Sequence, residues 1–113
     1  MTQNSIKYNM DIKTVEDNVD IAAGLLKALS NEKRLTIICA LYKGEKSVGE
    51  LEEIVGLSQS ALSQHLARLR RDGLVDTRRE AQTIYYSMQD KATQSLLKCL
   101  SEIYCLDQIG TAV

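Results

Sequence analysis

The chain has 113 residues, 44% of them hydrophobic, and its 14 lysines and arginines nearly balance its 15 aspartates and glutamates. This length supports one modest core, so we expect a single domain, and the near-neutral charge argues against broad non-specific binding to nucleic acid. No apolar run approaches the roughly 18 residues of a membrane span, and no secretion signal opens the chain, so we expect a cytoplasmic protein without membrane contact.

The predicted domain covers residues 13–108. It lies between a polar N-terminal segment, residues 1–12, which is expected to be flexible, and a short C-terminal tail, residues 109–113. Apolar residues recur at helical spacing from about Thr14 to Leu29, and they predict the first helix.

A second helix is predicted to follow at once. Ser30 and Asn31 indicate its N-cap, and Gly44 ends it. Four residues with the spacing i, i+3, i+4, i+7 form its apolar face: Leu35, Ile38, Cys39 and Tyr42. We therefore expect Cys39 to face the core.

A capping box opens the third helix. Ser47 and Glu50 have the S-x-x-E spacing, in which each side chain accepts a hydrogen bond from the other residue's backbone N–H. Leu51 and Ile54 are expected to point inward, and Gly56 closes the helix. The sequence GLS that begins at this glycine predicts a tight turn into the next helix.

The segment SQSALSQHLARLRRDGLVDTRREAQTIYYSM, Ser58 to Met88, predicts a helix followed by a hairpin. Ser58 is a candidate N-cap and Gly73 a candidate C-cap. One helix face carries Leu62, Leu66 and Leu69, and the other carries Ser60, Ser63, Gln64, Ala67 and Arg71. Together with the two short helices before it, this pattern predicts a mainly α-helical winged helix-turn-helix with a small β-hairpin wing.

The basic residues concentrate in this segment. Five of the six arginines lie within twelve residues: Arg68, Arg70, Arg71, Arg78 and Arg79. A local basic face can neutralise phosphates even when the whole chain is slightly acidic.

The last predicted helix runs from Asp90, a candidate cap, to Gln108. Its apolar stripe is wider than a monomer of this size needs: Leu96, Leu97, Leu100, Ile103 and Tyr104. We expect a homodimer in which the first and last helices pair across a twofold axis. Two recognition helices one DNA turn apart would then match a pseudo-palindromic operator.

Three stretches resemble the ArsR/SmtB family of bacterial repressors: LLKALSNEKRLTIICAL at 25–41, KSVGELEEIVGLSQSALSQHLARLRRDGLVDTRREAQTIYYSM at 46–88, and IYC at 103–105. Within the family the chain is most similar to the persulfide-sensing BigR/SqrR/HlyU branch. This resemblance implies a repressor that binds double-stranded operator DNA as a homodimer.

The resemblance also implies DNA-binding positions. Base edges would be contacted by Gln59, Ser60, Ser63 and Gln64, whose side chains can donate and accept hydrogen bonds in the major groove. Phosphates would be contacted by Arg68 on the helix and by Arg78 and Arg79 on the wing. Each of these side chains could instead be an ordinary solvated surface residue. His65 could either pack within the domain or contact DNA.

No metal cofactor is expected. Many members of the family are metal sensors with a C-x-C pair in the third helix or histidines in the last one, whereas this chain has Val48 and Gly49 in the first place and no histidine in the second. Its three cysteines are expected to be reduced in the cytoplasm, which disfavours a structural disulfide.

The resemblance implies that Cys39 and Cys105 form a redox-sensing pair. In the persulfide-sensing branch, two thiols at these places become linked by several sulfur atoms after reaction with persulfide or polysulfide. Taken alone, Cys39 could be a small core residue. Cys99 lies about 120° around the helix from Cys105 and is expected to be inert packing.

The sequence therefore predicts a repressor that binds its operator when reduced and is released by reactive sulfur species. Two regulatory alternatives remain open: a general peroxide or disulfide-stress sensor, and a constitutive DNA-binding regulator or antagonist. An enzyme is not expected, because no cofactor loop or acid–base pair stands out.

Overall fold

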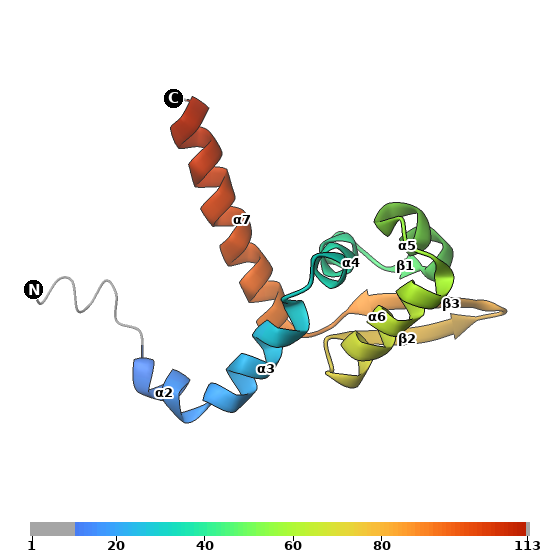
Figure 1. The fold of residues 1–113 in the computed structure, drawn as a ribbon, viewed down its shortest axis with the longest axis horizontal. Coiled ribbons are helices and arrows are strands. Elements are labelled where there is room, and N and C mark those ends of the chain that lie inside the picture. The colour runs from blue at the N-terminus through green and yellow to red at the C-terminus, as the bar shows by residue number, and fades with distance from the viewer. Residues whose placement is uncertain (1–10, 113) are drawn as a thin grey trace, which may run out of the picture.

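An aliphatic core joins five helices to a small sheet, and two helical arms extend from it (Figure 1). The computed structural model describes the backbone of residues 11–112 and the side chains of residues 11–105. In chain order the elements are α2 (Ile12–Asp17), α3 (Val19–Leu29), α4 (Glu32–Tyr42), β1 (Lys46–Ser47), α5 (Val48–Val55), α6 (Gln59–Arg71), β2 (Val75–Glu80), β3 (Thr83–Met88) and α7 (Lys91–Ala112). None of the helices in this range is long and apolar enough to cross a bilayer.

The predicted first helix is divided at Asn18. Its side-chain amide donates to the carbonyl oxygen of Thr14 at 2.7 Å, and its backbone leaves the helical region, so α2 ends there and α3 begins. Of the segment predicted to be flexible, residues 1–10 lie outside the described part. Asp11 instead caps α2, which already begins at Ile12.

The buried face of helix α4 matches the predicted one only in part, because Ile38 is buried and Leu35 packs against the core, but the face is rotated from the predicted stripe. Its buried side chains are Ile37, Ile38, Ala40 and Leu41, whereas Cys39 is exposed, so the prediction that this thiol faces the core is wrong. The inward face includes Arg34 at its N-terminal end. Because arginine is charged, the apolar pattern of the sequence did not include this residue in the face. That guanidinium donates to the last carbonyls of α3, with Nε 2.6 Å from the oxygen of Ala28.

The helix-turn-helix confirms most of the predicted signals. Ser47 and Glu50 form the capping box, and Gly56 ends α5 in the left-handed conformation at φ 74°. Ser58 caps α6, whose Leu62, Leu66 and Leu69 are all buried. One detail is wrong: Val55 rather than Ile54 joins Leu51 in the core, and Ile54 is 49% exposed.

The wing is the predicted hairpin with one added strand. β2 pairs with β3 in antiparallel register from Val75↔Met88 to Glu80↔Thr83, and the two-residue strand β1 pairs with the far side of β3. The strand order is therefore β1-β3-β2, with β3 in the centre. This third strand ties the wing to the residues immediately before α5.

Helix α7 leaves the domain as a long arm (Figure 1). Asp90 accepts a hydrogen bond from the backbone N–H of Thr93 at 2.9 Å, which confirms it as the cap. The helix continues to Ala112, so the tail predicted from residue 109 is helical up to that point. Leu97 is buried, but Ile103 and Tyr104 are 49% and 61% exposed.

Candidate nucleic-acid interface and thiol site

Helix α6 presents one polar face to solvent. Gln59, Ser60, Ser63 and Gln64, the four predicted base-contacting residues, are all exposed on it. The three leucines of the opposite face fix the helix to the core, because each is at most 1% exposed. The amide and hydroxyl groups are therefore accessible to a partner, and the helix is held rigidly beneath them. The Ser60 hydroxyl also lies 3.4 Å from that of Ser58.

Arg68 is held at the C-terminal end of this helix. Its Nε lies 2.9 Å from a carboxylate oxygen of Asp72, and about a third of its side chain is exposed. Arg71 approaches the same carboxylate at 4.0 Å. A phosphate contact by Arg68 would therefore replace an ion pair that is only partly exposed to water.

The two wing arginines differ. Arg78 donates to both carboxylate oxygens of Glu45, at 2.7 and 2.9 Å, and to Glu80 at 3.0 Å. Arg79 is exposed and, among the side chains described, enters no ion pair. Because neighbouring residues in a strand point to opposite faces, Arg78 and Arg79 lie on opposite faces of the wing. The sequence predicted the same phosphate-contacting role for both residues, whereas in the structure only Arg78 is paired with carboxylates.

The side chain of His65 is only partly exposed to solvent. It is half-buried, and burial, with a smaller effect of the nearby Arg34, lowers the pKa of its imidazole below the usual value. The ring is therefore neutral near pH 7, without the positive charge that would attract a phosphate.

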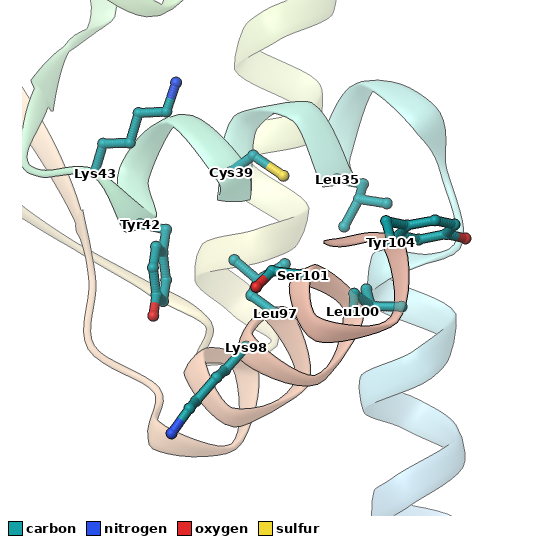
Figure 2. Close-up of a pocket in the computed structure, with 9 residues that line it drawn as sticks. All are labelled: Leu35, Cys39, Tyr42, Lys43, Leu97, Lys98, Leu100, Ser101 and Tyr104. Atoms are coloured by element: carbon teal, nitrogen blue, oxygen red, sulfur yellow. The ribbon is translucent and has the colours of Figure 1, made fainter. Parts of the chain in front are cut away.

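Cys39 lines a pocket between α4 and α7 of about 380 Å³. Figure 2 shows its sulfur directed into this space, with Ser101 and Tyr104 of α7 on the other side. The remaining lining is mostly apolar: Leu35, Tyr42, Lys43, Leu97, Lys98 and Leu100. An exposed thiol at the junction of two helices is accessible to a small reagent, unlike a core cysteine.

Cys105 is also exposed and lies on α7 beyond the lining residues. It follows Ser101 by four residues and Lys98 by seven, so the helical repeat puts all three on one stripe, and the other two line the pocket. Cys99 belongs instead to the stripe of Leu96 and Ile103, and none of these three residues lines the pocket. Among the described side chains, no three His, Cys, Asp or Glu residues gather where they could hold a metal ion.

An exposed polar helix that follows a tight helix turn and precedes a hairpin wing defines the winged helix-turn-helix DNA-binding regulators. Residues 31–77 match the model described as "Bacterial regulatory protein, arsR family". The chain is 51% identical to the transcriptional activator HlyU of Vibrio cholerae over 96 residues, 85% of this chain and 89% of the relative. It therefore belongs to the ArsR family of bacterial transcriptional regulators.

Solved structures agree with this assignment. The crystal structure of the transcriptional repressor BigR from Xylella fastidiosa matches 85% of this chain and 98% of its own at a TM-score of 0.81 and 41% identity. A homodimeric winged helix-turn-helix DNA-binding domain from Mycobacterium bovis matches 88% of this chain and 90% of its own at a TM-score of 0.69 and 29% identity. Relatives thus include one named an activator and one named a repressor.

Proposed function

We propose that the protein is a dithiol-controlled repressor, which binds operator DNA while Cys39 and Cys105 are reduced and leaves it when reactive sulfur species link them. Membership in a family of transcriptional regulators supports the first half. The observation that carries the second half is the exposed Cys39 thiol, which lines the pocket between α4 and α7 (Figure 2).

The DNA contacts are assigned to α6 and the wing. Gln59, Ser60, Ser63 and Gln64 supply donors and acceptors to base edges, while Arg68 and Arg79 supply charge to phosphates. The exposure of the four polar side chains supports this assignment. The resulting interface positions the helix in the major groove and the wing along the backbone.

The functional unit is proposed to be a homodimer through α2, α3 and α7. These helices carry most of the large apolar side chains that the protomer leaves exposed: Ile12, Val15, Val19, Ile21, Leu26, Ile103 and Tyr104. Apolar area of this extent stabilises an interface when it is removed from water. The relative from Mycobacterium bovis, which is described as homodimeric, supports the dimeric state but does not identify the helices of the interface.

The sulfur chemistry balances with a polysulfide R–S–S–S–R as the oxidant. The Cys39 thiolate attacks the central sulfur and releases one thiolate RS⁻. The Cys105 thiolate then attacks the same sulfur and releases the second RS⁻, which leaves Cys39–S–S–S–Cys105. A longer polysulfide leaves a longer bridge, which tolerates a wider separation than the Cα distance of about 7 Å that limits a disulfide.

The bridge would act on DNA through geometry. It would tie α4, which packs within the DNA-binding domain, to α7, which carries the dimer contact, and so change the separation or angle of the two recognition helices. A loss of about 3 kcal/mol in binding, roughly a hundredfold in affinity, makes an effective switch.

The test uses a duplex that the reduced protein selects from a randomised library. Treatment with an organic trisulfide should release the wild-type protein and Cys99→Ser from this duplex, whereas Cys39→Ser and Cys105→Ser should stay bound. Mass spectrometry should find extra sulfur between the Cys39 and Cys105 peptides. A plain disulfide formed with peroxide would favour a general oxidative-stress sensor. Release of either single-cysteine variant would refute the dithiol mechanism.

A further inference from the structure

Arg78 is the most highly connected charged side chain on the wing. All three of its guanidinium nitrogens donate to carboxylates: Nε and Nη2 to Glu45 at 2.7 and 2.9 Å, and Nη1 to Glu80 at 3.0 Å. The carbon at the centre of the guanidinium also lies 4.5 Å from the ring centroid of Tyr85. A two-pronged contact with one carboxylate, backed by an aromatic ring, fixes both the position and the plane of the group.

These contacts span the whole width of the sheet. Arg78 stands on the outer strand β2, directly opposite Tyr85 on the central strand β3. Glu45 lies beyond β3, in the loop immediately before β1, 33 residues from Arg78 in the chain. The guanidinium therefore passes over the ring of Tyr85 to reach the far edge of the sheet. We call Arg78, Glu45, Glu80 and Tyr85 the wing clamp.

The wing clamp gives Arg78 little capacity to attract a phosphate. One positive charge is set against the two negative charges of Glu45 and Glu80, so the local sum is −1. The hydrogen bonds from Arg78 lower the pKa of the Glu45 carboxyl below its usual value, and both partners stay charged near pH 7. Arg79, on the opposite face and in no ion pair among the side chains described, presents an unopposed charge.

We propose that Arg78 is a positioning residue and not a phosphate contact: it holds the wing to the loop before the helix-turn-helix and so sets where Arg79 meets DNA. The loop matters because Glu45 is two residues from Ser47, which caps α5. The clamp therefore joins the wing to the start of the helix-turn-helix. This inference rests on the proposed DNA binding and replaces the phosphate role expected for Arg78.

The salt dependence of binding separates the two roles, because each phosphate contact releases counterions while a positioning residue releases none. The probe is the duplex selected by the wild-type protein, titrated between about 50 and 200 mM salt. Arg78→Ala should weaken binding about two- to fivefold, the range of a surface ion-pair network, at an unchanged slope of log affinity against log salt. Arg79→Ala should lower that slope by about 0.9.

A charge exchange provides the second measurement. The double variant Glu45→Arg with Arg78→Glu keeps the net charge and should recover part of the affinity that Arg78→Ala loses, because it restores the ion pair across the sheet but sets the new carboxylate beside Glu80. If Arg78 contacts a phosphate, a glutamate there is repelled, and the double variant binds more weakly than Arg78→Ala. That result, or a slope lowered by about 0.9 in Arg78→Ala, would overturn the proposal.

A third measurement needs no DNA. Amide hydrogen exchange in β2 and β3 should quicken in Arg78→Ala and stay unchanged in Arg79→Ala, because only the first loses contacts within the sheet. If the wild-type protein selects no duplex, the proposed function fails, whereas the exchange experiment still decides whether the clamp exists. Equal exchange in Arg78→Ala and wild type would show that it does not.

Discussion

On α5, two adjacent residues differ in burial and are therefore expected to differ in how much they contribute to the stability of the fold. Val55 is 5% exposed and belongs to the core, whereas its neighbour Ile54 is 49% exposed. The sequence favoured Ile54 because it follows Leu51 by three residues, but Val55 follows Leu51 by four, and both spacings fit one helical face. Burial by the surrounding helices and sheet decides between them, and local periodicity does not contain that information.

We therefore predict unequal costs for two truncations. Val55→Ala should lower the free energy of unfolding by about 2 kcal/mol, since it removes buried methyl groups and leaves a cavity. Ile54→Ala should lower it by no more than about 0.5 kcal/mol, as for an exposed site. Urea denaturation followed by circular dichroism measures both. Equal losses, or a larger loss for Ile54→Ala, would show that α5 is rotated from the face described.

At the scale of elements, predictability follows the range of the interaction. The capping roles of Gly56 and Ser58 depend on hydrogen bonds to residues a few positions away in the chain. The turn and the start of α6 could therefore be predicted from the sequence. The strand β1 is two residues long and exists only because β3 lies beside it, so no local pattern indicates it. The same holds for the Glu45–Arg78 pair, whose members only the folded sheet brings together.

Helix α4 is the element where the local pattern predicted the inward face only in part. Of the predicted face, Ile38 is buried, whereas Leu35, Cys39 and Tyr42 line the pocket toward α7. Of these three, Leu35 also packs against the core. The consequence favours the thiol proposal, because an exposed Cys39 is accessible to a reagent. The family resemblance made Cys39 a candidate, and that role stays a prediction, whereas the helical pattern misjudged the surroundings of the thiol.

The wing clamp predicts a pH dependence with a definite sign. The hydrogen bond from Arg78 lowers the pKa of Glu45 below its ordinary value of 4.5. A carboxyl whose pKa is lowered by folding stabilises the wing fully above that ordinary value, and the stabilisation is lost as the pH falls through the lowered pKa. The wing should therefore loosen only in acid and be insensitive to pH near neutrality.

Carbon-13 NMR of the glutamate carboxyls measures this directly. In the wild-type protein Glu45 should titrate below 4.5, and in Arg78→Ala its pKa should return toward that value. Glu50 is the internal control, because its pKa is also lowered, by the backbone N–H and the hydroxyl of Ser47, and neither contact involves Arg78. A Glu45 titration that is the same in both proteins would contradict the clamp.

Helix α7 has two different sides, one toward the core and the pocket and one toward solvent. One side of the helix contributes Leu97 to the core and lines the pocket with Leu100, Ser101 and Tyr104, while another side leaves Ile103 uncovered. A helix that serves the thiol site and the dimer at once can transmit a change at one to the other. In the proposed mechanism, DNA binding would report the state of the thiols only if the protein is dimeric.

The last prediction tests that requirement. Ile103→Glu puts a carboxylate on the uncovered apolar side of α7, and a twofold interface would bury two such charges without partners. We expect the dissociation constant of the dimer to rise at least about a hundredfold, which is ~2.7 kcal/mol. Sedimentation equilibrium measures it, with Gln94→Glu as a control, because Gln94 lies on the opposite side of the same helix. The duplex affinity of Ile103→Glu should fall in parallel, since a single protomer contacts only half of a two-half-site operator. A dimer that persists in Ile103→Glu would mean that α7 pairs through another face, and the route proposed from the thiols to the recognition helices would not hold.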